Sequence, residues 1–284
     1  MKDARVHQTH LQHDLHVMLQ RNLQRREALS WLLAGGSAAL LVGCGGGSNE
    51  MASPSDPGNG AGSGACIANA SETNGPYPSD GSNTVNGMVS NVLQESGVVR
   101  SDIRPGFGSS TGIAEGVPLT LTLKVLNSNN SCAALSGYAV YAWHCTRDGM
   151  YSLYSAAVRD ENYLRGVQVS DSNGEVTFTT VFPGCYAGRY PHIHFEVYPS
   201  LSMATLYTNR ILTSQLAFER DLCSAIYQNA SGYSASLDNL AGVTIASDGV
   251  FGDNSAAQMA QMTAAVSGSV AAGYTGSIVV GVPA

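Results

Sequence analysis

Short apolar runs separated by turn signals are the feature of this sequence that most restricts its fold. In residues 117–127 (VPLTLTLKVLN), Leu119, Leu121, Leu123 and Val125 alternate with other residues and would share one face of a strand. Further runs of this kind occupy residues 137–145, 174–183, 192–198 and 207–213, with turn signals such as NSNNS, DSNG and PG between them. The pattern predicts an all-β domain, a β-sandwich of mostly antiparallel strands.

Residues 254–268 (NSAAQMAQMTAAVSG) leave helix and strand both open. Their alanines favour a helix, but this far into a β domain the segment could equally be a strand or irregular.

The first 44 residues have the features of an export signal. The pair Arg25-Arg26 precedes a short apolar run, and small residues lead to Cys44. The run is shorter than the roughly 20 apolar residues of a membrane span. Residues 41–44 (LVGC) resemble the lipobox of bacterial lipoproteins, in which the cysteine carries the lipid. A disordered N-terminus with a chance arginine pair is the less favoured alternative, because the three signal regions occur in the right order.

The rest of the chain divides into a linker and one domain. Residues 45–66 are rich in Gly, Ser, Pro and Asn, cannot form a core and read as a flexible linker. Residues 67–284 have the composition of a folded domain. We therefore expect an exported, extracytoplasmic protein, periplasmic or at the cell surface, whose only membrane attachment is a lipid on Cys44.

Charge limits the possible partners of this chain. Its formal net charge is −7, and five of its 14 basic residues but only three of its 21 acidic residues precede Cys44. The part after the signal is thus more acidic still. This argues against nucleic acid, which requires clustered Lys and Arg, and no polybasic patch for anionic lipid is present.

The cysteines after Cys44 permit disulfides but do not define them. They are odd in number and form no CxxC pair, which makes a zinc knuckle or a thioredoxin-like site unlikely. Export to an oxidising compartment would allow some to pair. The pairing and the oligomeric state do not follow from the sequence; the cysteines concerned are Cys66, Cys132, Cys145, Cys185 and Cys223.

Two histidines stand one residue apart in a chain that has few. Four of the seven lie in the first twenty residues, and only His144, His192 and His194 follow. Residues i and i+2 of a strand face the same side, so His192 and His194 would project together and form half of a metal site. An HxH pair alone slightly favours the alternative, two ordinary half-buried histidines. His144 would point away from its strand neighbours, and we expect it to be structural.

Tyrosines near this pair favour a metal site. Tyr186 lies six residues before His192, and Tyr151 follows another expected strand. Phenolate is a hard anionic oxygen donor that suits Fe(III) better than zinc or a soft metal. Neither HExxH nor CxxC zinc patterns occur.

Residues 183–195 (PGCYAGRYPHIHF) resemble the ferric-ligand motif of the intradiol ring-cleavage dioxygenases, the family of catechol 1,2-dioxygenase and protocatechuate 3,4-dioxygenase, and most closely its exported single-chain members. Residues 143–154 (WHCTRDGMYSLY) resemble the segment that carries the other ligand tyrosine, with Tyr154 as a nearby competitor to Tyr151. The resemblance extends from about Ser71 to the C-terminus. It places the motif residues at Trp143, Tyr151, Tyr186, Arg189, His192 and His194.

The resemblance implies a β-sandwich enzyme that cleaves a catechol-type aromatic with O2 to a cis,cis-muconate-type dicarboxylate. Non-haem Fe(III) would be held by Tyr151, Tyr186, His192 and His194, and no external reductant would be required. Tyr186 would also leave the metal and act as the base. Arg189 would stabilise negative charge that develops on the ring.

Other segments resemble parts of the family's substrate pocket. Residues 213–218 (TSQLAF) place Gln215 near the substrate, and residues 71–78 (SETNGPYP) place Tyr77 along the cleft, with Trp143 as a further pocket residue. Cys185 departs from the family, in which a large aromatic is common there. It could line the pocket, bind a thiophile or pair with Cys145.

Other functions fit the sequence less well. The alternative that we retain is an exported β-sandwich binding lipoprotein whose metal site is inactive or repurposed. A zinc hydrolase or a cupin-type Fe(II) oxygenase needs three histidines, or two and a carboxylate. A Ser-His-Asp hydrolase lacks the GxSxG elbow. The identity of the catechol does not follow from the sequence.

Overall fold

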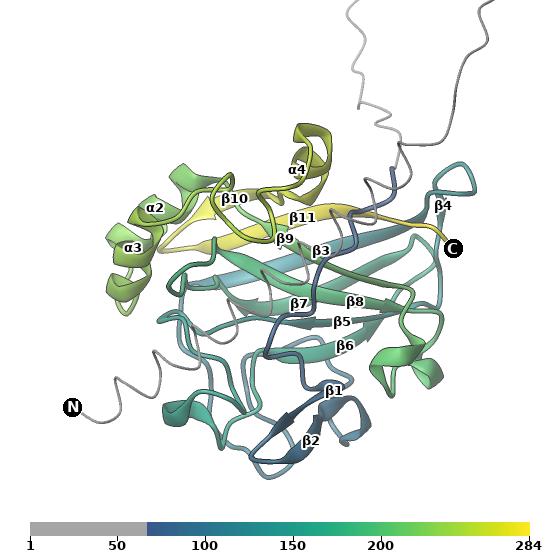
Figure 1. The fold of residues 1–284 in the computed structure, drawn as a ribbon, viewed down its shortest axis with the longest axis horizontal. Coiled ribbons are helices and arrows are strands. Elements are labelled where there is room, and N and C mark those ends of the chain that lie inside the picture. Colours follow the sequence, from purple (N-terminus) through teal and green to yellow (C-terminus); the bar gives the residue numbers. More distant parts are fainter. Residues whose placement is uncertain (1–66) are drawn as a thin grey trace, which may run out of the picture. The chain divides into compact units, whose positions relative to one another are not determined.

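The computed structural model describes residues 67–284, and its strands form two larger sheets and one hairpin (Figure 1). The expectations for residues 1–66, namely the export signal and the linker, lie outside the described residues. The strands are β1 (Asp80–Val85), β2 (Met88–Asn91), β3 (Pro118–Asn127), β4 (Ala133–Ala134), β5 (Ala139–Trp143), β6 (Arg165–Val169), β7 (Glu175–Val181), β8 (His192–Tyr198), β9 (Leu212–Ala217), β10 (Ala265–Ser269) and β11 (Gly273–Val282).

The first larger sheet has five strands centred on β3. Its order is β10-β11-β3-β4, and β7 also pairs with β3. The β3–β11 pair is parallel, whereas β3 and β7 are antiparallel. Leu119, Leu121, Leu123 and Val125 of β3 are all buried on one face, as their alternation predicts.

The second larger sheet has the order β6-β5-β8-β9 and is antiparallel throughout. All seven residues of β8 are buried, so both faces of this strand are covered. Ile193, Phe195 and Val197 belong to the main core cluster, together with the apolar residues of β3 and β7. The alternate residues of β8, beginning with His192 and His194, therefore face away from that core.

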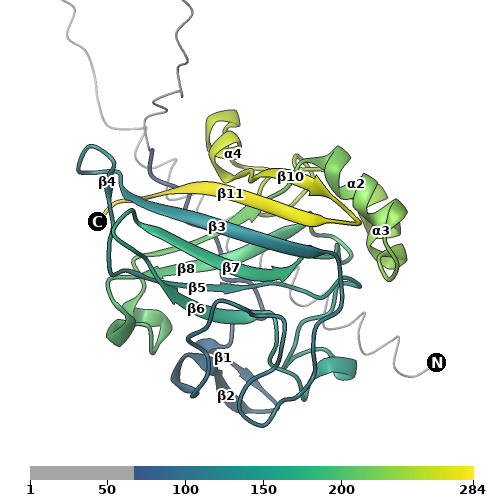
Figure 2. The same ribbon diagram turned by 180° about the vertical axis from the view of Figure 1, so that it is seen from behind.

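The main core lies between the two sheets, which makes the domain a β-sandwich and confirms the predicted fold class. Figure 2 shows the strands of the two sheets from behind, with β11 and β3 above β8, β5 and β6. A second, smaller cluster covers the opposite face of the β6-β5-β8-β9 sheet. This outward face carries the candidate site.

Two helices between β9 and α4 are the part of the fold that the sequence patterns did not predict. Residues 254–268 turn out to contain both alternatives, α4 followed by β10, and the strand expected at residues 207–213 begins only at Leu212. The helices are α2 (Arg220–Asn229), α3 (Ser234–Ala241) and α4 (Ala256–Met262), and the 3-10 turns are η1 (Val92–Gln94), η2 (Ala156–Val158), η3 (Leu201–Met203) and η4 (Tyr207–Asn209).

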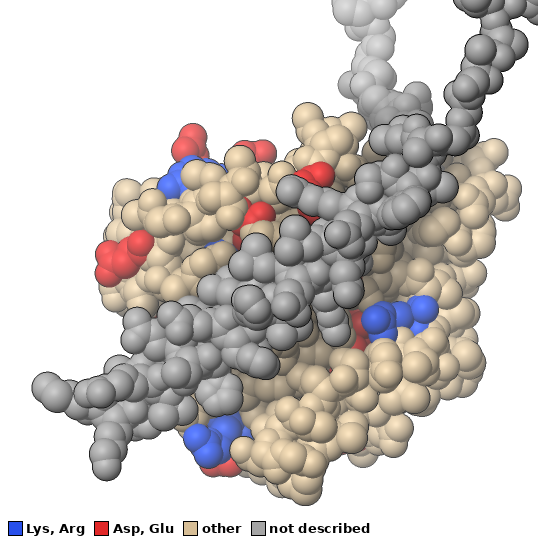
Figure 3. Space-filling model, in the orientation of Figure 1, with Lys and Arg blue, Asp and Glu red and all other residues tan. Residues whose placement is uncertain are grey.

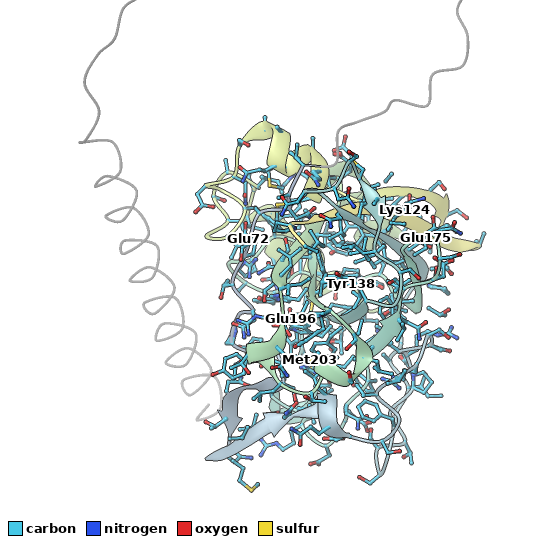
Figure 4. All side chains as sticks on the ribbon, turned by 90° about the vertical axis from the view of Figure 1, so that its right-hand side faces the viewer. Glu72, Lys124, Tyr138, Glu175, Glu196 and Met203 are labelled. Atoms are coloured by element: carbon cyan, nitrogen blue, oxygen red, sulfur yellow. The ribbon has the colours of Figure 1, made fainter. Side chains whose placement is uncertain are left out.

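The surface is sparsely charged. The face in Figure 3 shows only scattered groups of Lys, Arg, Asp and Glu among uncharged residues, in keeping with a charged fraction of 12%. One cross-strand ion pair joins Lys124 of β3 to Glu175 of β7 at 3.2 Å, and both are labelled in Figure 4. Within residues 67–284, no helix has the length and apolar character needed to cross a membrane.

Truncation of Leu121 tests the assignment of the β3 face to the core. Leu121 is 1% exposed, so Leu121→Ala should lower the free energy of unfolding by about 2–5 kcal/mol through lost burial and a cavity. The neighbouring Thr120 is exposed, and Thr120→Ala should cost less than about 1 kcal/mol. Urea denaturation of the domain measures both, and equal losses would contradict this assignment.

Candidate active site

Strand pairing places four of the site's side chains in one row across the second sheet. Arg165 of β6 is opposite Trp143 of β5, Trp143 is opposite His194 of β8, and His194 is opposite Gln215 of β9. The Trp143 and His194 rings stack with centroids 4.8 Å apart and planes only 5° from parallel. This flat contact fixes the plane of the His194 imidazole.

His192 and His194 point to the same face of β8, as their spacing predicts. Each is 2% exposed, and their Nε2 atoms lie 3.1 Å apart. The Nδ1 atom of His192 is 2.5 Å from the carbonyl oxygen of Tyr190, which makes Nδ1 the protonated nitrogen and leaves the Nε2 lone pair free. Burial lowers the pKa of both imidazoles, so both are neutral and able to bind a cation.

Tyr151 and Tyr186 reach the same point from two loops. Tyr151 follows β5 and is 1% exposed, and its hydroxyl oxygen is 3.4 Å from His192 Nε2. Tyr186 lies between β7 and β8, and its ring centroid is 5.7 Å from that of Tyr151 and 5.7 Å from that of His192. Burial raises the pKa of both phenols, so they ionise only if a nearby cation compensates for the desolvation.

These four donors fit a hard trivalent cation. Two imidazole nitrogens bound to one metal at about 2.1 Å and at right angles lie about 3 Å apart, close to the observed separation of the Nε2 atoms. Residues 67–284 contain no cluster of three or more His, Cys, Asp or Glu suited to a metal. The two phenols add oxygen donors to the pair of imidazoles, and phenolate oxygen favours Fe(III).

Arg189 is buried beside the four donors and is held on two sides. Its Nε donates to Asp248 Oδ2 at 2.9 Å, and its Nη2 donates to Gln215 Oε1 at 2.6 Å. Gln215 in turn donates from Nε2 to the carbonyl oxygen of Thr73 at 2.9 Å. The remaining nitrogen, Nη1, is buried and has no hydrogen-bond partner among the described residues.

Asp248 was not predicted as a site residue. Its side chain is fully buried. Burial by itself raises the pKa of the carboxyl, but Arg189 and the backbone N–H groups of Tyr190 and Phe251 outweigh it, so the pKa lies below its usual value. In the sequence Asp248 is only one acid within the short segment ASDGVF, and nothing there identifies Arg189 as its partner.

Arg165 is a second residue that was not predicted. It is fully buried and donates to the hydroxyl and carbonyl oxygens of Ser152, at 3.1 and 3.0 Å, and to the carbonyl oxygen of Pro78 at 3.0 Å. Ser152 and Pro78 each follow an aromatic residue of the site, Tyr151 and Tyr77. Arg165 thereby joins the two loops whose tyrosine rings pack with centroids 4.7 Å apart.

The expected pocket residues fall into two groups. Tyr77 and Trp143 pack in the same cluster as Tyr151 and Tyr186. Cys185 belongs instead to the main core cluster, and its thiol lies 3.3 Å from the carbonyl oxygen of Arg189. A role for Cys185 in the pocket stays a prediction.

Several alternatives from the sequence are resolved by hydrogen bonds and bonding states. Tyr154 donates its hydroxyl to Asn83 at 2.9 Å and accepts from the backbone of Ser79, away from the imidazoles. The ring nitrogens of His144 bond the Cys145 carbonyl oxygen and the Thr180 hydroxyl, a structural role as expected.

The suggested disulfide bond between Cys145 and Cys185 is not formed. Cys145, Cys185 and Cys223 are buried free thiols, whereas Cys132 is disulfide-bonded.

Gly75 lies directly against His194 and allows a test of that contact. Its φ is +68°, and a Cβ there would lie 3.2 Å from His194 Cε1. Gly75→Ala should destabilise the domain by about 1 kcal/mol or more, from the backbone conformation and from displacement of the imidazole. Gly87 is the matched control, because its φ is +81° with nothing within 4 Å of the added Cβ. Equal losses in urea denaturation would contradict a tight contact with His194.

Known proteins resemble this chain in both sequence and fold. No family model matches it. Chlorocatechol 1,2-dioxygenase from Rhodococcus opacus is 27% identical over 158 residues, covering 43% of this chain. The chain spans only 59% of that relative's length.

Solved structures support the same family at the level of fold. An intradiol ring-cleavage dioxygenase from Tetranychus urticae has a TM-score of 0.58 and 24% identity, with 77% of this chain and 96% of that chain covered. A second dioxygenase crystal structure has a TM-score of 0.55 and 24% identity, with coverages of 77% and 95%. The chain therefore has the fold of the intradiol ring-cleavage dioxygenases, the family that its Tyr-Arg-His motif resembles.

Proposed function

We propose that this protein is an Fe(III)-dependent intradiol dioxygenase that cleaves a catechol-type aromatic with O2 to a cis,cis-muconate-type dicarboxylate. The observation that supports this most strongly is the convergence of two imidazoles and two phenols beside Arg189, all on the outward face of one sheet. Tyr151, Tyr186, His192 and His194 would hold the metal. Bound Fe(III) would act as a Lewis acid that activates a chelated catechol toward O2.

The two phenols have different surroundings, which supports different roles for them. Tyr151 is 1% exposed and packs against the Tyr77 ring. Tyr186 is only half-buried and is followed by the exposed residues Ala187 and Gly188. Tyr186 is thus the phenol with more room to move, which supports a role in which its ionised hydroxyl accepts a proton from the catechol.

Arg189 supplies a hydrogen-bond donor for the charge that develops on the ring. Two of its nitrogens are bound to Asp248 and Gln215, so only Nη1 remains for a ligand. A fixed donor in a buried site stabilises developing negative charge without reorganisation during the reaction. Gln215 contributes by holding Arg189, and Trp143 by fixing the plane of His194.

Export is part of this proposal and rests on the N-terminal sequence alone. The paired arginines and the lipobox-like residues before Cys44 support secretion followed by lipidation. Fractionation of cells that express the wild-type protein and Cys44→Ser tests it. The wild-type protein should be membrane-associated and the variant should not, and an identical distribution would exclude a lipid on Cys44.

Oxygen uptake with simple catechols tests the activity. The iron-loaded domain should consume O2 when catechol is added and should form a ring-opened dicarboxylate, and 18O2 should label it with two oxygen atoms. Loaded protein that binds iron at this site but consumes no O2 with any catechol would favour the binding lipoprotein instead.

Replacement of single tyrosine hydroxyls tests the metal ligands. Tyr151→Phe removes a proposed donor, so it should weaken iron binding by at least about 10-fold and lower O2 uptake to near background. Tyr154→Phe removes a hydroxyl bonded to Ser79 and Asn83, and it should keep both iron and activity. Iron content after dialysis, measured by atomic absorption, compares the two variants. Equal iron in both would contradict the assignment of Tyr151.

A further inference from the structure

Asp248 is an acid buried in the loop between α3 and α4, and all of its carboxylate contacts are with donors. Oδ1 accepts from the backbone N–H groups of Val250 and Phe251, at 2.8 and 3.0 Å. Oδ2 accepts from the backbone N–H of Tyr190 at 2.6 Å and from Arg189 Nε at 2.9 Å. One oxygen therefore closes the loop, and the other reaches across to the segment that carries the site.

The second oxygen determines where the Arg189 side chain can lie. A guanidinium is planar and presents its donors in a fixed fork. With Nε on Asp248 and Nη2 on Gln215, rotation about the side chain is blocked, and Nη1 is left buried without a described partner. A buried, unpaired donor of this kind costs free energy unless a ligand accepts from it.

The charge of Asp248 has a second effect on Arg189. Once a bound cation has ionised the two phenols, an uncompensated guanidinium in this buried site would be attracted to their oxygens, since opposite charges interact strongly where water is excluded. The carboxylate at 2.9 Å supplies a permanent counter-charge. Arg189 can then donate from Nη1 to a substrate without itself pairing with a tyrosine.

The same carboxylate is joined to the histidine pair. Oδ2 accepts from the Tyr190 N–H, and the Tyr190 carbonyl oxygen bonds His192 Nδ1. Phe251, whose N–H is bound by Oδ1, has its ring centroid 6.3 Å from that of His192. Asp248 thus bonds Arg189 directly and also bonds Tyr190 and Phe251, which both lie against His192.

We propose that Asp248 is a positioning residue that holds Arg189 so that Nη1 alone is directed to the substrate. This inference rests on the proposed function, because it takes a catechol to be the substrate to which Nη1 donates. Gln215 of β9 is the second support of Arg189 and accepts a hydrogen bond from its Nη2. The competing explanation is that Asp248 serves only to close its own loop through Oδ1.

A double-mutant cycle separates these explanations. Asp248→Asn keeps the size of the side chain but replaces one acceptor oxygen with an NH2 donor. That donor must then face an N–H group of Arg189, of Tyr190 or of the loop, with which it cannot form a hydrogen bond. We expect kcat/KM for catechol to fall by about 10- to 100-fold, because the catalytic donor is misplaced. In an Arg189→Met background the same change should lower kcat/KM by less than about 2-fold, since the two residues act as one unit.

Controls keep this cycle interpretable. Asp253→Asn changes an exposed acid of the same loop and should leave kcat/KM unchanged. Iron content should stay at the wild-type level in Asp248→Asn, and anaerobic titration with catechol should show weaker binding than in the wild type. Equal losses from Asp248→Asn in both backgrounds would overturn the positioning role.

Crystal structures of the wild type and Asp248→Asn give a readout that does not depend on activity. The proposal requires Arg189 to leave Gln215 in the variant while Trp143 and His194 keep their stack. An Arg189 that stays in place would overturn it. A wild-type protein that neither binds iron nor consumes O2 contradicts the proposed function, whereas the position of Arg189 in the variant still decides the role of Asp248.

Discussion

The close approach of two neutral imidazoles is the constraint on which the rest of the site depends. The Nε2 atoms of His192 and His194 are 3.1 Å apart in a place from which water is largely excluded. The position of β8 between β5 and β9 enforces this approach, because Trp143 stacks on His194 from one side and Gln215 lies opposite it on the other. The sheet therefore brings together two imidazole nitrogens that one cation could bind at once.

Charge compensation and hydrogen bonding together explain why so many polar groups can be buried around these imidazoles. Arg189 is paired with Asp248, and together they add no net charge to the site. Arg165 is equally buried, and its guanidinium donates hydrogen bonds to hydroxyl and carbonyl oxygens. Unpaired charges in such surroundings would be costly. Two ionised phenols would in turn offset most of the charge of a trivalent cation, which makes a buried ferric site physically reasonable.

Local patterns were sufficient to predict most of the strands and the common face of His192 and His194. The alternation in β3 and the spacing of His192 and His194 each depend on a period of two, which is a property of the strand itself. Tyr151 and Tyr186 followed from resemblance to a known motif. The sandwich could thus be predicted because its strands are regular and are separated by clear turn signals.

Long-range contacts and short helices could not be predicted in this way. Asp248 lies 59 residues after Arg189, and nothing in either segment identifies the other as its partner. In α2, the buried residues Cys223, Ile226 and Tyr227 do follow helical spacing, but ten residues are a weak signal beside many strands. Only the fold reveals that Gln215 holds Arg189.

Iron-edge anomalous diffraction from crystals of the Fe(III)-loaded domain would test the central claim most directly. The account predicts one strong peak bonded by His192 Nε2, His194 Nε2 and the hydroxyl oxygens of Tyr151 and Tyr186. A peak elsewhere, or no peak at this position in protein that contains iron, would contradict it.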